Sequence, residues 1–394
     1  MKISRIAAFV TASFMTICLA TSVNVQAVTT EGTANSISVK KSTMRNMTTA
    51  QIVKDMGLGF NLGNTLEACG DWINGKSVKD YEIAWGAPVT TKAMIDGIHN
   101  NGFNSLRIPV AWSNLMAADY TINPQLFDRV EEVMNYALDD NMYVIINLHY
   151  DNGWVNKFST DYDGTMKKYK AVWTQISKRF AKYGDHLIFE SQNEDGCYDN
   201  IWNHYDKNAS GKDKAYEILN SVNQVFVDLI RNSGGNNKKR HLLIAGYATD
   251  VDLTTDSLYK MPRDPQNHLA VSIHYYSPYP FVLMEKDADW GKVRTTWGTD
   301  DDLKQLNNDM NKLKTTFIDK GIPVIIGEYG MYQKNKTPEM IRLWMTSVCK
   351  SAYGLGICPM IWDVQADHNF YNRNTSQFND PELVKELRVI AGMR

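Results

Sequence analysis

The strongest constraint on the fold of this chain is a repeated alternation of short β-rich segments with helical segments. The β-rich segments are apolar runs bounded by turn residues, and the segments between them place apolar residues at a period of about 3.6. An alternation repeated eight times predicts a parallel sheet, and eight parallel strands close into a (β/α)8 TIM barrel. The expected strands are 57–66, 104–112, 142–151, 186–194, 241–249, 269–277, 323–330 and 358–365.

The helical segments have recognisable capping residues. Thr90 or Thr91 can cap a helix that ends at 100–102, and Asn123-Pro124 opens a helix over 125–140. An open doubly wound sheet would also use this alternation, but no glycine-rich phosphate loop follows the first strand. Further helices are expected at 165–183, 212–231, 300–320, 337–353 and 381–393, whereas 250–266 has weak periodicity.

The first 27 residues have the pattern of a secretory signal peptide. Lys2 and Arg5 precede an apolar run from Ile6, and Val25-Gln26-Ala27 forms a small-x-small cleavage site. An uncleaved anchor is the alternative, but the apolar run is short and interrupted by Thr and Ser. We therefore expect a secreted, extracellular protein with a polar spacer over 28–47 and a single catalytic domain over 48–394.

The charge balance excludes some partners. The chain has 42 basic and 44 acidic residues, a formal net charge of -2. No strong field is available to hold a nucleic acid or an anionic membrane surface. We expect no nucleic-acid partner, no membrane association after signal cleavage, and a monomer.

Four cysteines follow the expected cleavage site: Cys69, Cys197, Cys349 and Cys358. An even number in an exported protein is compatible with disulfides, although spacing cannot give their connectivity. Free thiols remain the alternative, and no CxxC pair indicates zinc.

Polar and aromatic side chains gather where the predicted strands end. The carboxyl ends of the strands and the loops after them form the functional face of a TIM barrel. Packing alone would favour Val, Ile or Leu at these positions, so six strand ends of this kind indicate a site. They hold Arg107, His149, Asn193, Glu194, His274, Tyr276, Glu328 and Trp362.

Glu194 and Glu328 are the acids at two of these strand ends. Hydrolysis of a glycosidic bond needs one carboxylic acid to protonate the leaving oxygen and one carboxylate to attack or to activate water. The fourth and seventh strands lie on roughly opposite sides of an eight-stranded barrel, so the two side chains can face each other across a bound chain.

The ordered series of rim residues resembles glycoside hydrolase family 5, a family of retaining (β/α)8 enzymes. The runs GFNLGNTLE at 59–67 and RIPVAW at 107–112 are similar to its branch of endo-β-1,4-glucanases with broad substrate range. The resemblance extends from about residue 48 to the end of the chain. It implies a cellulase that cleaves internal bonds of cellulose and related β-glucans by double displacement, with a β-linked polysaccharide as partner and with no cofactor and no metal.

The resemblance also implies roles for the two acids. Glu194 would be the general acid/base, with its pKa raised by a nearby charge so that it is protonated before catalysis. Glu328 would be the nucleophile, kept ionised by Arg107 and by a hydrogen bond from Tyr276.

The remaining rim residues would bind and orient the sugar. Asn193 would bond the sugar 2-OH, and Trp362 would form an apolar floor beneath the sugar next to the scissile bond. His149 and His274 would bond hydroxyls and orient the carboxylates, and Asn61 matches a sugar-contacting position of the same branch.

The segment around Glu194 has two features of its own. Strand alternation places Glu190 on the same side as Glu194 but deeper, so we expect Glu190 to join a buried polar network with Arg107. Asp195-Gly196 follows Asn193-Glu194 where the family usually has Pro. This change is expected to loosen the loop and to affect the pKa of Glu194.

Aromatic content also suggests a carbohydrate partner. Flat aromatic faces stack on the apolar faces of pyranose rings, although about half of the loop tryptophans are expected simply to cap the barrel core. The long loop 278–301 is expected to line one end of the cleft. The tryptophans outside the predicted helices are Trp72, Trp85, Trp112, Trp154, Trp202, Trp290, Trp297 and Trp362.

Three alternative functions remain open on the sequence. A hydrolase of the same family could prefer xyloglucan, mixed-linkage glucan, xylan or mannan. A catalytically inactive barrel could bind polysaccharide, although such a protein has no need of a paired acid and nucleophile. A metal-dependent barrel hydrolase would draw its ligands from His149, Asp151, His274, Asp363, Asp367 and His368.

Overall fold

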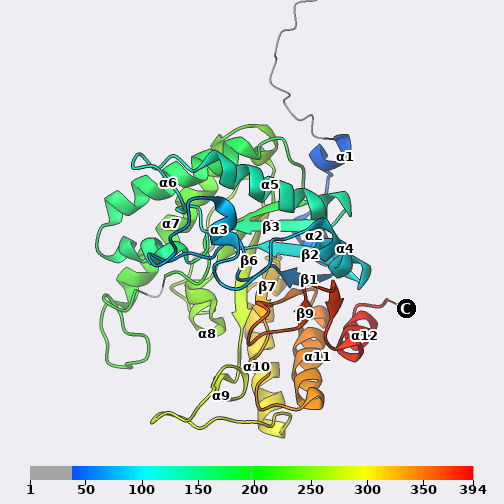
Figure 1. The fold of residues 1–394 in the computed structure, drawn as a ribbon. Coiled ribbons are helices and arrows are strands. Elements are labelled where there is room, and N and C mark those ends of the chain that lie inside the picture. The colour runs from blue at the N-terminus through cyan, green and yellow to red at the C-terminus, as the bar shows by residue number, and fades with distance from the viewer. Residues whose placement is uncertain (1–37, 197, 394) are drawn as a thin grey trace, which may run out of the picture. The chain divides into compact units, whose positions relative to one another are not determined.

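A closed barrel of eight parallel strands forms the centre of the computed structural model, which describes residues 38–196 and 198–393 (Figure 1). Each strand pairs with the next along the chain, and β1 also pairs with β8. The predicted (β/α)8 TIM barrel is therefore confirmed. Its strands are β1 Leu58–Asn61, β2 Phe103–Ile108, β3 Tyr143–Asn147, β4 Leu187–Glu190, β5 Leu242–Ala245, β6 Leu269–Tyr275, β7 Val324–Tyr329 and β8 Cys358–Ile361.

Helices connect successive strands, and two expected caps are present. Thr91 is the N-cap of α4, and Asn123 caps α5 by accepting a hydrogen bond from the backbone N–H of Gln125. A short antiparallel pair, β9 Tyr371–Asn372 and β10 Gln377–Phe378, lies in the loop after β8. The α-helices are α1 Val39–Ser42, α2 Thr49–Asp55, α3 Val78–Glu82, α4 Lys92–Asn100, α5 Pro124–Asp139, α6 Tyr162–Arg179, α7 Lys212–Asn232, α8 Val251–Thr254, α9 Tyr279–Val282, α10 Asp300–Thr316, α11 Pro338–Gly354 and α12 Pro381–Ile390, and the 3-10 helices are η1 Asp151–Ser159, η2 Gly235–Lys238, η3 Tyr247–Thr249 and η4 Ile318–Lys320.

All eight strands occur where the sequence predicts them, but each ends earlier than predicted. The β4 ladder stops at Glu190, so Glu194 lies in the following loop rather than on the strand. The apolar pattern continues beyond the ladder because residues at the rim are still buried. The residues between the end of the ladder and the rim do not follow regular strand geometry, so the functional side chains there need not alternate between the two faces of the sheet.

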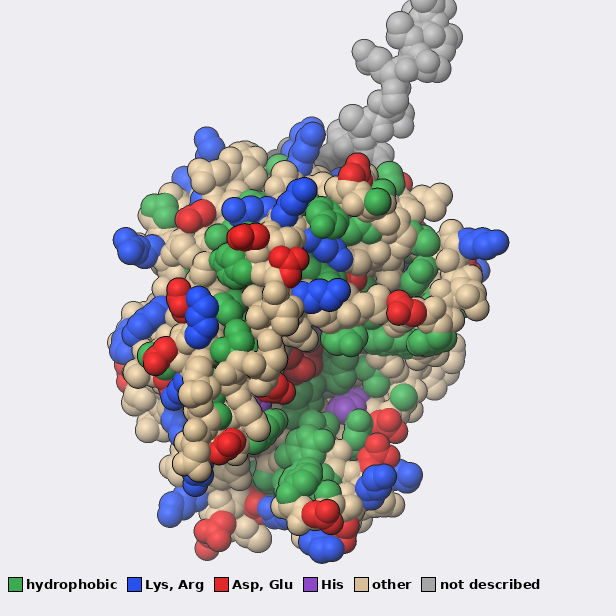
Figure 2. All heavy atoms as spheres, turned by 90° about the vertical axis from the view of Figure 1, so that its left-hand side faces the viewer, with side chains coloured by type: hydrophobic (Ala, Val, Ile, Leu, Met, Phe, Trp, Pro, Cys, Tyr) green, Lys and Arg blue, Asp and Glu red, His purple; other side chains and the backbone are tan. Residues whose placement is uncertain are grey.

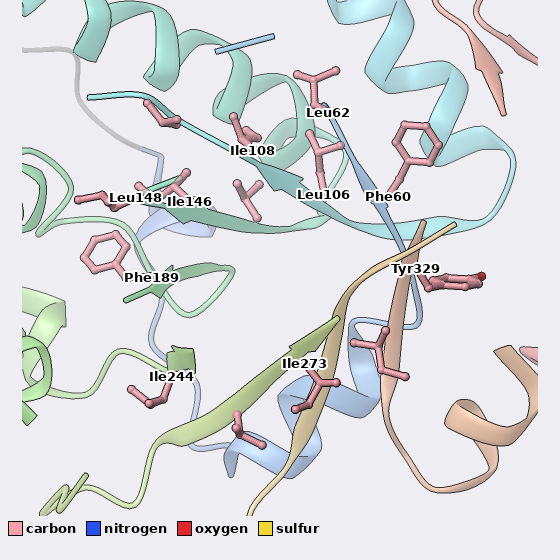
Figure 3. Close-up of a cluster of buried hydrophobic side chains, with 14 of the residues drawn as sticks. Phe60, Leu62, Leu106, Ile108, Ile146, Leu148, Phe189, Ile244, Ile273 and Tyr329 are labelled. Atoms are coloured by element: carbon pink, nitrogen blue, oxygen red, sulfur yellow. The ribbon is translucent and has the colours of Figure 1, made fainter. Parts of the chain in front are cut away.

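The core has two layers because successive strand residues point to opposite faces. Leu106 and Ile108 face the surrounding helices together with other outward-pointing residues, some of which are shown in Figure 3. The barrel interior holds a smaller cluster that includes Ile145, Ile188 and Ile325, and α2 adds Ile52 to it from the amino ends of the strands. The same alternation sends Arg107 into the barrel, between two outward-facing neighbours.

The boundary between spacer and domain requires a correction. Residues 38–47 were expected in the polar spacer, but Arg45 bonds the buried carboxylate of Asp185 at 2.9 Å and also donates to Tyr143. The backbone N–H of Gly184 donates to the carbonyl of Lys41. These contacts make residues from 38 onward part of the folded domain.

The predicted signal peptide lies outside the described residues. Over 38–196 and 198–393, no helix is both long enough and apolar enough to cross a membrane. Three of the four cysteines, Cys69, Cys349 and Cys358, are buried free thiols.

Candidate active site

Arg107 is the central charge at the carboxyl end of the barrel strands. It lies on β2, is fully buried, and its guanidinium bonds both Glu190 and Glu328 at 2.7 Å. Its other N–H groups donate to the side-chain oxygens of Asn61 at 3.0 Å and Asn193 at 2.7 Å. A single cation therefore fixes side chains from β1, β4, β7 and the loop after β4.

Glu190 has the buried structural place that its strand position predicts. One carboxylate oxygen bonds Arg107, and the other accepts a hydrogen bond from the Ser272 hydroxyl at 2.7 Å. Ser272 was not singled out from the sequence. Strand periodicity could have found it, since Ser272, His274 and Tyr276 alternate along β6 and its end as polar groups on the interior side.

Glu328, the penultimate residue of β7, is rigidly held. Its Oε1 accepts from Arg107 at 2.7 Å, and its Oε2 accepts from the Tyr276 hydroxyl at 2.9 Å. Its side chain is only 6% exposed. Both oxygens are thus oriented by donors, one from β2 and one from the residue that follows β6.

Glu194 has a more open setting. Its side chain is 49% exposed, and Oε1 lies 2.8 Å from Nδ1 of His274. The same Nδ1 lies 3.4 Å from Oε2 of Glu328. His274 therefore bridges the two acids and lies closer to Glu194.

The electrostatics of the two acids differ from the sequence expectation. Burial opposes ionisation of Glu194, but the hydrogen bond and charge of His274, helped by Arg107, lower the pKa of Glu194. Burial raises the pKa of Glu328 against the opposing charges of His274 and Arg107. The expectation of a raised pKa for Glu194 is wrong for the substrate-free site, because His274 stabilises the carboxylate form.

His149 and Trp362 form a flat aromatic wall. Their rings stack with centroids 5.8 Å apart and an angle of 9°. Burial, together with Arg107 and His274, holds the pKa of His149 well below its usual range, so this imidazole is neutral. Gly63 allows the loop after β1 to approach this wall, since a Cβ there would lie 2.6 Å from the carbonyl oxygen of Asp363 and 3.1 Å from the Trp362 ring.

Asn61 does not have the place that the resemblance implies. It is fully buried, its oxygen accepts from Arg107, and its amide donates to the carbonyl of Gly327 at 2.8 Å. A sugar cannot reach a side chain enclosed in this way. Asn61 instead holds Arg107 in position.

Asp195 is also buried, with a side-chain oxygen that has no hydrogen-bond partner. Burial is the main reason that the pKa of Asp195 rises to about 8, and the neighbouring charges of Glu194 and Asp151 add to it. The residue that departs from the family pattern is therefore a neutral acid at moderate pH.

The loop tryptophans divide as expected. Trp112, Trp154, Trp202 and Trp297 are buried in the core, whereas Trp72 and Trp290 are exposed. Figure 2 shows the hollow in this face, with acidic and histidine side chains inside it and hydrophobic side chains along it.

The distance between the acids limits what the site can do. Glu194, His274 and Glu328 each offer a ligand atom, and these atoms lie within 4.8 Å of one another. Such a triad could hold a cation. No other group of three such ligands occurs in the described part of the chain, so the wider ligand set considered from the sequence is not assembled there.

A TIM barrel with two facing carboxylates at the carboxyl ends of its strands defines the class of this protein, a glycoside hydrolase. Comparison with known proteins gives the family. Residues 66–368 match the model of the cellulase family, glycosyl hydrolase family 5.

Relatives match over most of the chain. Endoglucanase B of Clostridium cellulovorans is 38% identical over 367 residues, which cover 90% of this chain and 78% of that protein. Endoglucanase A of Ruminococcus albus is 37% identical over 339 residues, which cover 85% and 88%. The structure of a broad specificity endoglucanase from Ruminococcus champanellensis with bound cellotriose has 35% identity and a TM-score of 0.78, covering 87% of this chain and 99% of that one. The chain belongs to glycosyl hydrolase family 5, as its sequence predicts.

Proposed function

We propose that this protein is an endo-β-1,4-glucanase that hydrolyses internal bonds of cellulose and related β-glucans with retention of configuration. The supporting observation is the close approach of Glu194 and Glu328, whose nearest ligand atoms lie within 4.8 Å of each other. Retaining enzymes hold their carboxyl groups about 5 to 5.5 Å apart, whereas inverting enzymes need about 6.5 to 9.5 Å to admit a water molecule.

Glu328 is the proposed nucleophile. Attack by one of its oxygens on the anomeric carbon forms a glycosyl ester and breaks the bond to the leaving oxygen. Arg107 and Tyr276 hold the two carboxylate oxygens in place, so little reorganisation is needed before attack. Arg107 also compensates the negative charge of Glu328 in a buried site.

Glu194 is the proposed general acid/base. It delivers a proton to the leaving oxygen in the first step and removes a proton from water in the second, when water cleaves the ester. In the free site its carboxylate form is favoured by His274. We infer that the bound sugar displaces or weakens this contact, which raises the proton affinity of Glu194 at the moment when a proton is needed.

The supporting residues bind the sugar at this centre. The side-chain oxygen of Asn193 is occupied by Arg107, which leaves its amide group to donate to the sugar 2-OH. The neutral His149 ring and Trp362 provide the wall and floor, and His274 positions both carboxylates. Asn61 supports Arg107 without touching the substrate.

The substrate is a β-linked glucan. The Ruminococcus champanellensis relative is a broad specificity endoglucanase with bound cellotriose, which favours a β-1,4-glucan for this chain as well. Mixed-linkage glucan and xyloglucan remain substrates to compare, followed by xylan and mannan. The pattern of residues 1–27 further supports cleavage of a signal peptide and secretion to the outside of the cell.

Product analysis tests this function directly. The purified protein is incubated with cellulose, mixed-linkage glucan, xyloglucan, xylan and mannan, and the products are separated by size. Release of mixed oligosaccharides from β-1,4-glucan with an initial β-anomer signal in NMR supports the proposal. An initial α-anomer would refute retention, and the absence of glucan hydrolysis would refute the activity.

A further inference from the structure

Glu194, His274 and Glu328 each direct a metal-ligating atom into the same small space. These atoms all lie within 4.8 Å of one another. Nδ1 of His274 lies 2.8 Å from Oε1 of Glu194 and 3.4 Å from Oε2 of Glu328. Hydrolysis uses these side chains separately, for attack and for proton transfer, so their arrangement as a set of three ligands is a property of its own.

The spacing of these atoms suits a zinc ion. Zinc binds imidazole nitrogen and carboxylate oxygen at about 2.0 to 2.2 Å, so neighbouring ligand atoms of a tetrahedral site lie about 3.3 Å apart. The contact between His274 and Glu328 already has nearly this spacing. The contact between His274 and Glu194 is shorter, but Glu194 can adjust its position because its side chain is 49% exposed.

Nδ1 of His274 faces both carboxylates at once. An ionised carboxylate only accepts hydrogen bonds, so this nitrogen carries the hydrogen that points toward them. A metal ion would take the place of this hydrogen. The displaced proton passes to water, Nδ1 binds the ion through its lone pair, and each carboxylate exchanges its contact with the N–H for a bond to the metal.

The charge of the centre also favours a doubly charged cation. Arg107 bonds two carboxylates, Glu190 and Glu328, and offsets one of their two charges. The remaining charge and that of Glu194 leave two formal negative charges that a neutral His274 does not offset. A dication offsets both of them.

The surroundings of the ligands indicate reversible binding. Glu328 is held ready by Arg107 and by the Tyr276 hydroxyl. Within the described part of the chain, Nε2 of His274 is buried and has no hydrogen-bond partner. Resident metal sites orient their histidines through a partner on the second ring nitrogen, and its absence lowers the affinity.

We propose that Glu194, His274 and Glu328 form an inhibitory binding site for Zn²⁺ or a similar divalent transition-metal ion. The bound ion occupies the nucleophile and the acid/base together, so hydrolysis stops until the ion leaves. The inhibitory effect rests on the proposed glucanase function, whereas the metal site does not. Mg²⁺ and Ca²⁺ prefer sites made only of oxygen ligands and should bind poorly.

Calorimetry with Zn²⁺ tests the site directly. Wild type, treated with EDTA and dialysed, should bind one ion. Glu328→Gln removes an anionic ligand and should weaken zinc binding more than about 10-fold, since even an outer partner of a metal ligand is worth about 10- to 100-fold. The same variant should still bind cellotetraose, which shows that it is folded. His204→Gln is the matched control, at a histidine 3.6 Å from Asp199 and outside the site, and should bind zinc like wild type.

Inhibition is measured with an uncharged aryl β-cellobioside, because the carboxylates of carboxymethylcellulose would themselves bind the metal. Zn²⁺ should raise the apparent KM with little change in kcat, and EDTA should restore the activity in full. Equal concentrations of Mg²⁺ or Ca²⁺ should have no effect.

The site and the glucanase function can fail separately. No zinc binding by wild type, equal zinc affinities of Glu328→Gln and wild type, or loss of binding in His204→Gln would overturn the site and leave the glucanase function intact. Inhibition that lowers kcat without changing KM would also overturn it, because the ion would then act away from the bound sugar. A wild-type protein that binds one zinc ion as expected but hydrolyses no β-glucan would instead refute the proposed function.

Discussion

The free energy of unfolding of this protein should depend on pH through one identified residue, Asp195. Burial raises the pKa of Asp195 from its ordinary value of 3.8 to about 8 in the folded protein. The folded state therefore holds a proton that the unfolded chain releases above about pH 4. By linkage, this residue lowers the stability of the folded protein as pH rises between these two values.

The magnitude follows from the size of the shift. Between pH 5 and pH 8 the linkage amounts to about 4 kcal/mol, because the proton difference between the two states persists over nearly three pH units and each unit corresponds to about 1.4 kcal/mol. Asp195→Asn retains the shape of the side chain but cannot ionise. The variant should therefore gain about 4 kcal/mol relative to wild type over this interval, or about 5 °C in Tm for a domain of this length.

The assay is thermal unfolding of both proteins at pH 5 and pH 8, followed by tryptophan fluorescence. Asp289→Asn, a change at an exposed acid of the loop after β6, serves as the matched control and should follow wild type at both pH values. If the Tm values of wild type and Asp195→Asn fall in parallel between pH 5 and pH 8, the buried, neutral state of Asp195 is refuted.

Other outcomes test the catalytic centre. Glu328→Gln should lower kcat by about 10³-fold or more while calorimetry still detects cellotetraose binding; retained turnover would refute its role as nucleophile. Arg107→Met leaves Glu190 and Glu328 buried without their shared cation, and urea unfolding should show a loss of about 3 to 5 kcal/mol. Tyr276→Phe removes the 2.9 Å bond to Glu328 and should lower kcat about 10-fold with little change in KM. Incubation with EDTA should leave hydrolysis unchanged, whereas a loss that a divalent cation restores would show that a metal belongs to the site.

Much of the site could be predicted because barrel geometry makes strand ends converge. Arg107 bonds rim residues from β1, β7 and the loop after β4, and Glu190 joins them from deeper in the barrel as strand alternation requires. The sequence could not predict which hydrogen-bond partner each polar side chain has. Asn61 lies at the carboxyl end of β1, where a sugar-binding residue would be expected, but Arg107, β7 and β8 enclose its side chain.

The proton affinities of the acids show the same limit. The family resemblance implied a protonated Glu194, yet in the structure His274 lowers the pKa of Glu194 and burial raises the pKa of Glu328. Asp195 would have an ordinary pKa if the loop after β4 pointed into solvent, and its burial is the main reason that its pKa is raised. These properties depend on distances of a few ångströms between residues far apart in the chain.

The sequence by itself determined the eight strand–helix units, the barrel they close into, and the family, because periodicity, caps and rim motifs are local patterns that need no coordinates. Only the tertiary structure decided how closely Glu194 approaches Glu328, which acid His274 stabilises, and which aromatic rings stay exposed. The physical reason is that hydrogen bonding, desolvation and charge interactions depend on closure of the barrel, which brings distant segments within contact.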